Sequence, residues 1–431
     1  MEFQAVLLAG GRGSRLTELT ASVPKPLLPV GNRPMIWYPL NLLERAGFEE
    51  VIIITTKEVR NQLNTFPALS TKIHLDYQII PEDSDSSTAD SLRLVRKRIK
   101  TNVLVVSCDL VTDACLQPLV DLFRLRNAAL VALVRQVDEP TEPIPGQKGK
   151  RPHEQRDFVG LDESGTRLLS LASEADLDDD LSLKKSLLCR FSRIHIKTNL
   201  MDAHLYCLKK WVLDLLAEEK SISSVKGELV PFLVKKQFSA PLGQKDLHAF
   251  IPADGLAGLA QERSAWDETE AAGRHGGAIR CYVHQLRGGL CLRANTLASY
   301  VEANKQVARV LPSLMVAEEC LIHPSASISE KSQVGADSMV GRETQVEERT
   351  SVKRSVVGDY CVVRLRSKIT SSIVMHRVTI GEGCNIQGSV LCEGAVLGAG
   401  VELKDCLVGS RIEVEPRVKR TNEIIERMIM I

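Results

Sequence analysis

A glycine-rich segment with several basic residues follows the first apolar run of the chain, residues 5–9. Glycines at such a place let the backbone turn tightly and bring its N–H groups close to a phosphate. Arginine and lysine side chains add positive charge to the same segment. The residues concerned are Gly10, Gly11, Arg12, Gly13, Arg15 and Lys25. This pattern indicates a site for a phosphorylated ligand, although a plain strand-to-helix turn uses the same glycines.

The wider string over residues 8–27 is more specific than the glycines alone. It reads Leu-Ala-Gly-Gly-Arg-Gly-Ser-Arg-Leu at 8–16 and Pro-Lys-Pro-Leu at 24–27. This string resembles the signature of the sugar-nucleotide pyrophosphorylases. In that family the loop wraps a nucleoside triphosphate, and the lysine, here Lys25, touches phosphate. The resemblance implies a Rossmann-like nucleotidyltransferase domain.

Size and composition limit the possible classes of protein. The chain has 431 residues and a formal net charge of +1, which gives no overall bias toward nucleic acid or acidic membranes. It opens without a secretory signal pattern and contains no apolar run of 18 residues, which predicts a cytosolic protein. Its 11 cysteines are scattered without a Cys-x-x-Cys pair, and its histidines form no ligand cluster. We therefore expect free thiols and no structural zinc.

Strand and helix signals alternate over residues 1–135. The predicted strands lie at 5–9, 51–56, 73–80, 103–107 and 130–134, and the predicted helices at 34–46, 89–99 and 114–125. Such alternation predicts a parallel, doubly wound sheet with ligands bound at the carboxyl ends of its strands. Further strands at 193–206 and 279–285, two helices up to 236 and a helix after Thr296 complete an α/β domain over residues 1–310. Residues 239–278 have weak periodicity and are predicted to form a flexible insertion.

The last third of the chain repeats with a period that neither helices nor alternating strands produce. Aliphatic residues recur every six positions in triplets, and the triplets recur every 17 positions. This pattern predicts a parallel β-helix over residues 320–415, in which each short strand ends in a turn to the next face of a prism. Resemblance to hexapeptide-repeat proteins implies that the β-helix is left-handed. Residues 416–431 are expected to form a C-terminal tail. The inward positions are Val340, Val346, Val352, Val357, Val363, Ile369, Val374, Ile380, Ile386, Leu391, Leu397, Leu403 and Val408, with an earlier coil at Ile322, Ile328 and Val334.

The resemblance to the pyrophosphorylases also shows which of their functional residues this chain retains. Asp109 stands where the family has its first metal-binding carboxylate, and Gln78 where it has a base-reading glutamine. The second metal-binding carboxylate is replaced by Arg293. A guanidinium at a metal site repels the metal but suits phosphate oxygens. We therefore expect no metal site and no metal-assisted transfer, with nucleotide binding left open. The remnant pocket comprises Gly10, Gly11, Gly13, Arg15, Lys25, Gln78, Asp109 and Arg293.

Two further positions depart from the pyrophosphorylase pattern. Ala175 stands where the family has a lysine that holds the sugar phosphate, and Asp176 lies beside it. His204 replaces a glycine of the sugar-contacting segment, where its side chain fills space. A core histidine with satisfied hydrogen bonds is the simpler interpretation of His204. These departures predict an enzyme-like domain without catalytic residues and without a cofactor.

Over nearly its whole length the sequence resembles the gamma family of pyrophosphorylase-like subunits of eukaryotic translation initiation factor 2B. The matching stretches include 24–32, 36–45, 88–92, 202–210 and 280–284. The resemblance implies a cytosolic complex that exchanges GDP for GTP on initiation factor 2. It also implies direct pairing with the epsilon subunit and contact with the other subunits and with initiation factor 2, without nucleic acid or membrane. Two alternatives remain, an active pyrophosphorylase of the GDP-mannose type and a hexapeptide acyltransferase.

Overall fold

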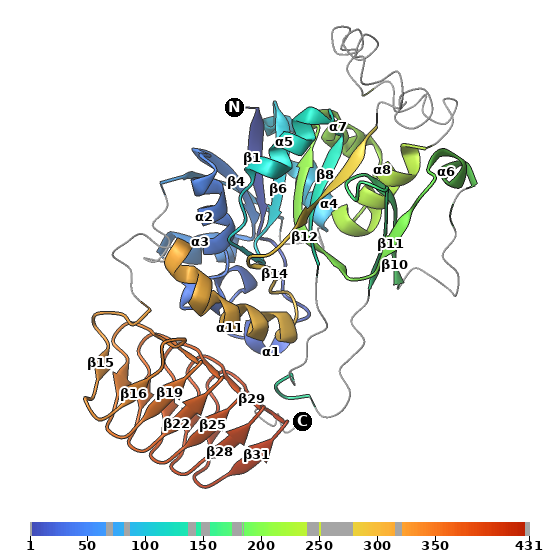
Figure 1. The fold of residues 1–431 in the computed structure, drawn as a ribbon. Helices are drawn as coiled ribbons and strands as arrows, with labels where there is room; N and C mark the ends of the chain where they lie inside the picture. Colours follow the sequence, from blue (N-terminus) through green and yellow to red (C-terminus); the bar gives the residue numbers. More distant parts are fainter. Residues whose placement is uncertain are drawn as a thin grey trace, which may run out of the picture.

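A computed structural model describes residues 2–65, 72–81, 87–136, 144–147, 156–174, 183, 185–238, 250, 279–314 and 321–426. An α/β domain lies above a β-helix, and helix α11 lies between them (Figure 1). The insertion predicted at 239–278 falls outside the described residues apart from Phe250, and Ala175 falls outside them too.

A seven-stranded sheet forms the centre of the α/β domain, in the order β13-β8-β12-β6-β1-β4-β5. All neighbours are parallel except β12, which runs antiparallel to both β6 and β8. The sheet is therefore mixed, whereas the alternation of elements predicts a parallel one. The antiparallel strand comes from outside the alternating region 1–135: the single strand predicted at 193–206 is divided at Thr198 and Asn199 into β11 and β12, and β12 lies between β6 and β8. The seven strands are β1 (Phe3–Leu8), β4 (Glu50–Thr55), β5 (His74–Ile79), β6 (Asn102–Ser107), β8 (Leu130–Gln136), β12 (Leu200–Leu208) and β13 (Cys281–Leu286).

Helices cover both faces of this sheet, because successive strand residues point to opposite sides. On β1, Val6 belongs to one core together with residues of α4, α7 and α8, whereas Leu7 belongs to a second core with residues of α2, α3 and α5. The predicted helices are confirmed with small shifts at their ends, and α3, which the sequence analysis does not predict, joins them. They are α2 (Trp37–Arg45), α3 (Lys57–Thr65), α4 (Thr88–Val95), α5 (Gln117–Leu125), α7 (Lys210–Glu218) and α8 (Val230–Lys236).

Shorter elements surround the carboxyl ends of the central strands. A three-stranded sheet has the order β10-β9-β11, and two ribbons pair β7 with β14 and β2 with β3. Helix α11 (Leu297–Leu314) starts after Thr296, whose hydroxyl accepts a hydrogen bond from the Ser299 N–H, as a helix cap does. The other bounds are α1 (Thr17–Thr20), η1 (Lys25–Leu27), β2 (Pro29–Val30), β3 (Arg33–Pro34), η2 (Arg96–Arg98), β7 (Leu110–Thr112), β9 (Asp157–Leu161), β10 (Leu168–Ser173), α6 (Lys185–Arg190), β11 (His195–Lys197), η4 (Val225–Leu229) and β14 (Cys291–Arg293).

The predicted repeats form a three-sided β-helix built from three parallel six-stranded sheets. Each inward residue pairs with the corresponding residue of the next coil, so Val363 lies between Val346 and Ile380. The thirteen predicted inward residues from Val340 to Val408 are all buried, and the stacks run on through β31 and β32, past residue 415. The first sheet contains β15 (Ser327–Ile328), β18 (Gln345–Val346), β21 (Val362–Val363), β24 (Thr379–Ile380), β27 (Val396–Leu397) and β30 (Glu413–Val414). The second contains β16 (Gln333–Val334), β19 (Ser351–Lys353), β22 (Lys368–Thr370), β25 (Asn385–Gln387), β28 (Glu402–Lys404) and β31 (Lys419–Thr421). The third contains β17 (Met339–Val340), β20 (Val356–Val357), β23 (Ile373–Val374), β26 (Val390–Leu391), β29 (Leu407–Val408) and β32 (Ile424–Ile425).

The third β-helix sheet is apolar on its outer side as well, and this side packs against the α/β domain. Each of its outer residues directly precedes an inward one, and five of them join a core with α11 and residues near the glycine-rich segment, such as Leu16 and Leu19. The Asn32 side-chain amide donates to the Val357 carbonyl at 2.8 Å, and the Ser22 and Ser410 hydroxyls lie 2.9 Å apart. The β-helix therefore packs against the part of the α/β domain that carries the glycine-rich segment. The five outer residues are Met339, Val356, Ile373, Val390 and Leu407.

Hydrogen-bonded side chains line one corner of the β-helix. Ser355, Ser372 and Ser389 are buried at the same position of successive coils. The Ser372 N–H donates to Ser355 Oγ at 3.1 Å, and the Ser389 N–H donates to Ser372 Oγ at 3.2 Å. This ladder gives buried backbone donors the partners that they need inside a prism.

The last described coil carries a charge in one of the inward columns. Arg420 pairs with Leu403 in the second sheet, at the position where every other coil has an aliphatic residue. Its side chain is 53% exposed, and its Nη1 lies 3.5 Å from Glu423 Oε2.

Candidate functional site

A buried carboxylate with two cationic partners lies at the carboxyl ends of the central strands. The Asp109 side chain is 1% exposed, and Asp109 lies in the two-residue turn between β6 and β7. Lys25 Nζ lies 2.7 Å from Asp109 Oδ2, and Arg293 Nη2 lies 3.1 Å from the same oxygen. The Arg293 Nε–H donates to Asp109 Oδ1 at 3.3 Å. The structure thus brings together three of the residues predicted for the remnant pocket.

Local pairing explains why these three side chains meet. Asp109 lies between β6 and β7, and β7 pairs with β14 so that Arg293 stands opposite Leu110. The Ala294 N–H donates to the Asp109 carbonyl at 2.9 Å, which fixes the end of β14 against the same turn. Lys25 is the first residue of the short helix η1, and Pro26 follows it in the first turn, where a helix tolerates proline.

The two cations hold the carboxylate ionised. Burial by itself would raise the pKa of Asp109, but the charges of Arg293 and Lys25 outweigh it and keep that pKa well below its usual range. Burial would lower the pKa of Arg293, and the Asp109 charge and hydrogen bonds raise it instead. Lys25, Asp109 and Arg293 therefore form a closed ionic cluster, in which the Asp109 carboxylate and the Arg293 guanidinium stay charged at neutral pH.

This cluster does not fit a divalent metal ion. Asp109 contributes one carboxylate, and no group of three potential metal-binding side chains occurs within the described ranges. At about 4 Å and an effective dielectric constant of about 20, a guanidinium and a divalent cation repel each other by roughly 8 kcal/mol. Arg293 already contacts both carboxylate oxygens of Asp109.

The glycine-rich segment has the backbone geometry expected of a tight turn. Gly13 has φ +77°, and a Cβ there would lie 2.7 Å from the Thr20 side chain. A Cβ on Gly10 would lie 2.2 Å from Ile80, whereas a Cβ on Gly11 would meet no atom within 4 Å. Gly11 and Arg15 are exposed. The backbone at Gly11 is therefore unobstructed, and the segment passes next to Lys25 at Gly13.

Gln78 does not join this cluster. It lies on β5, the edge strand two places from β1. Its side-chain amide donates to the carbonyl of its neighbour Ile79 at 3.4 Å.

A second buried polar group, which the sequence does not identify as a unit, lies on β12. The Tyr206 hydroxyl donates to Asp202 Oδ2, and the His204 N–H donates to Asp202 Oδ1 at 2.8 Å. Burial raises the pKa of Asp202 and, with the nearby charge of Arg293, lowers that of His204 well below its ordinary value. His204 has the left-handed φ of +51°, and its buried Nε2 has no hydrogen-bond partner among the described residues. The interpretation of His204 as a satisfied core histidine is therefore wrong.

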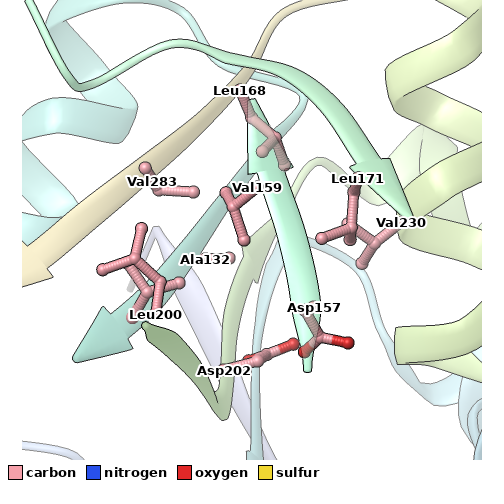
Figure 2. Close-up of a pocket in the computed structure, with 10 residues that line it drawn as sticks. Ala132, Asp157, Val159, Leu168, Leu171, Leu200, Asp202, Val230 and Val283 are labelled. Carbon is pink, nitrogen blue, oxygen red and sulfur yellow. The ribbon is translucent and has the colours of Figure 1, made fainter. Parts of the chain in front are cut away.

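A small cavity adjoins this group (Figure 2). The carboxylates of Asp157 and Asp202 lie at one end of it, and Lys226 Nζ is 2.7 Å from Asp157 Oδ2. The cavity has a volume of about 20 Å³, which is enough for about one water molecule. Its apolar wall is formed by Ala132, Val134, Val159, Leu168, Leu171, Leu200, Val230 and Val283.

Comparison with protein families defines the class of this chain. Residues 4–142 match the nucleotidyl transferase family, and residues 317–419 match the family described as the EIF2B subunit epsilon LbH domain. The chain thus consists of a nucleotidyltransferase domain followed by a left-handed β-helix. None of the helices in the described ranges combines the length and the hydropathy that crossing a membrane requires.

Individual relatives identify the family. The chain is 33% identical to translation initiation factor eIF2B subunit gamma of Schizosaccharomyces pombe, over 99% of this chain and 90% of that protein. It is 28% identical to the subunit of the same name in Dictyostelium discoideum, over 84% and 88%. Mannose-1-phosphate guanylyltransferase 1 of Arabidopsis thaliana is 22% identical over 99% of both chains. The chain belongs to the family of eIF2B gamma subunits.

Proposed function

We propose that this chain is a non-catalytic structural and docking subunit of the initiation factor 2B complex, which exchanges GDP for GTP on initiation factor 2. The observation that carries the absence of catalysis is the closed cluster of Lys25, Asp109 and Arg293. Nucleotidyl transfer joins two anionic substrates, so its site needs cations that are free to neutralise phosphate charge. Here Lys25 and Arg293 are both already paired with the Asp109 carboxylate.

The proposal extends to the organisation of the chain and its partners. The domains are the nucleotidyltransferase-like domain over 1–310 and the β-helix from 320, which includes β31 and β32 in the stretch 416–431, for which the sequence predicts a tail. The chain pairs directly with the epsilon subunit in the cytosol and contacts the other subunits and initiation factor 2. The remnant pocket that includes Gly10, Arg15 and Gln78 plays no catalytic part.

One experiment tests the absence of transfer. The purified chain is incubated with GTP, mannose 1-phosphate and Mg²⁺, and GDP-mannose is measured by chromatography. We expect no product above a buffer blank. Product that disappears in the variant Asp109→Ala would contradict the proposal and favour the alternative function, a sugar-nucleotide pyrophosphorylase of the GDP-mannose type. The glycine-rich segment and the distant mannose-1-phosphate guanylyltransferase relatives are the observations that favour this alternative.

A second experiment tests the role in exchange. GDP release from initiation factor 2 is measured with this chain alone, with epsilon alone and with both. We expect no stimulation by this chain alone and faster release with both than with epsilon alone. Appreciable release by this chain alone would contradict its assignment as a docking subunit.

A further inference from the structure

The outer side of the second β-helix sheet carries a local excess of positive charge, although the whole chain has a net charge of only +1. Residues 349–368 contain six basic side chains and one acidic one, Asp359, which lies in a turn at another corner of the prism, between the third and first sheets. The six basic side chains are all exposed. They belong to the neighbouring strands β19 and β22 and to the turns at the ends of these strands (Figure 1). This basic face comprises Arg349, Lys353, Arg354, Arg364, Arg366 and Lys368.

The basic face has no carboxylate partners of its own in the part of the chain that the structure describes. None of its six cations forms an ion pair there, whereas another exposed arginine of the β-helix, Arg377, lies 3.7 Å from Glu393. The acidic residues that precede the face are engaged elsewhere. Glu347 accepts a backbone N–H at 3.0 Å, and Glu348 lies 3.4 Å from Lys331. The charge of the basic face is therefore available to an anionic group of another molecule.

The residue types of the basic face indicate the chemistry of its partner. Four of the six cations are arginine, whose planar guanidinium binds carboxylates and phosphates through two parallel hydrogen bonds. Residues 349–354 and 364–370 include no aromatic residue, so the face offers no platform on which the bases of a single-stranded nucleic acid could stack. The partner is therefore recognised by its charge.

The size of the basic face limits the partner further. Residues 349–354 extend over about 15 Å, and two coils about 4.8 Å apart give a face on the order of 150 Å². A protein that recognises duplex nucleic acid covers about 600 Å² or more, which is several times the extent of this face. An extended peptide of about five residues has the length of the face, and its side chains on one side lie about 7 Å apart.

We propose that the basic face binds a short acidic segment of a partner protein. Carboxylates at alternate positions of an extended segment form charge-assisted hydrogen bonds with the arginines and lysines, which have no carboxylate partners within the described chain. This binding is electrostatic and takes place on an exposed surface, so it weakens as the salt concentration rises. The site is separate from the ionic cluster around Asp109 and from the third sheet, which packs against the α/β domain.

Substitution by glycine removes charge from the basic face in a way that the turns accept. Arg349 and Arg366 have left-handed φ values of +57° and +59°, and Gly383 stands at the same turn position of the next coil. Arg349→Gly/Arg366→Gly therefore suits the backbone. The control Arg377→Gly/Arg411→Gly removes two arginines from left-handed turns between the third and first sheets, where the φ values are +59° and +55°. The two double variants thus lose the same charge at the same kind of turn.

The test measures binding of fluorescein-labelled octaglutamate to the full chain by fluorescence anisotropy at low salt, and thermal unfolding verifies that both variants fold. We expect the wild-type chain to bind the peptide and to bind it more weakly at higher salt. Arg349→Gly/Arg366→Gly should lose at least fivefold in affinity, and Arg377→Gly/Arg411→Gly should change it by less than twofold.

Three results would overturn the inference. The first is that the wild-type chain does not bind octaglutamate, and the second is that the two double variants lose affinity equally. The third is that an RNA duplex binds more tightly than octaglutamate and loses affinity in Arg349→Gly/Arg366→Gly, which would assign the face to nucleic acid. None of these results depends on the exchange and transfer assays, so each leaves the proposed function intact.

Discussion

Replacing Ile380 and its neighbour Thr379 by aspartate tests the β-helix register residue by residue. Ile380 is fully buried and pairs with Val363 and Leu397, whereas Thr379 precedes it in the strand and faces outward. Loss of a buried aliphatic side chain costs about 2–3 kcal/mol. Because an aspartate with a pKa near 3.9 must be protonated to enter an apolar stack, it adds up to about 4 kcal/mol at pH 7. Local water entry reduces the sum, so we expect Ile380→Asp to lower the free energy of unfolding by about 3–5 kcal/mol.

The assay is urea unfolding followed by circular dichroism, with hydrogen exchange to locate the affected coils. With m values of about 1–3 kcal/mol per molar, Ile380→Asp should lower the midpoint by at least roughly 1 M. Thr379→Asp should cost less than about 1 kcal/mol. The Ile380→Asp deficit should also shrink by about 1.4 kcal/mol per pH unit between pH 7 and 5, because the folded state then holds a neutral acid. Equal midpoints for the two variants, or an Ile380→Asp deficit that does not change with pH, would refute the register or the buried state of the side chain.

Two further predictions concern His204 and the serine ladder. His204 has a lowered pKa in the folded protein, so the stability linked to it is present above the ordinary histidine pKa near 6.5 and is lost as the pH falls. The variant His204→Asn keeps a residue that tolerates the left-handed backbone. In urea titrations between pH 7 and 5, this variant should lose less stability than the wild type, by at most about 1.4 kcal/mol per pH unit. Parallel stability curves for the two proteins would contradict the lowered pKa. Ser372→Ala removes the acceptor of the Ser389 N–H and should lower the free energy of unfolding by about 1–3 kcal/mol. The control Ser351→Ala, on the outer side of the second sheet, should lower it by less than about 0.5 kcal/mol. Equal thermal midpoints for the two variants would show that the serine ladder does not contribute to stability.

Much of the fold can be predicted because it follows from periodicity. The inward columns of the β-helix repeat every 17 residues, and burial of Val340 through Val408 confirms them. The same repeat contains the outer aliphatic column of the third sheet, one residue earlier in each strand, such as Val356 before Val357. The strand β12 could not be predicted as a separate element, because β11 and β12 are separated by only two residues and together have the sequence pattern of one long strand.

The ionic cluster could be predicted only in part. Lys25 and Asp109 match recognisable motifs, and Arg293 departs from one. These motifs predict that the three residues lie in one pocket. Their direct pairing depends on the β7–β14 ribbon, which joins segments about 180 residues apart and leaves no local signal. The sequence likewise does not predict that the Nε2 of His204 lacks a hydrogen-bond partner among the described residues, because this depends on the tertiary neighbours of the side chain. His204 stands where the pyrophosphorylase family has glycine, however, and this was a sign of its left-handed backbone.

Arg420 places a charge on the end of an aliphatic column in the last described coil of the β-helix. Parallel strands at the end of a β-helix offer unpaired N–H and C=O groups, and another copy could extend each sheet by adding its own coils. An added coil would have to stack an aliphatic residue on the Arg420 column and enclose a guanidinium that now reaches solvent beside Glu423. A single charge in an otherwise aliphatic column thus opposes fibre formation, and it does so without altering the strands that precede it.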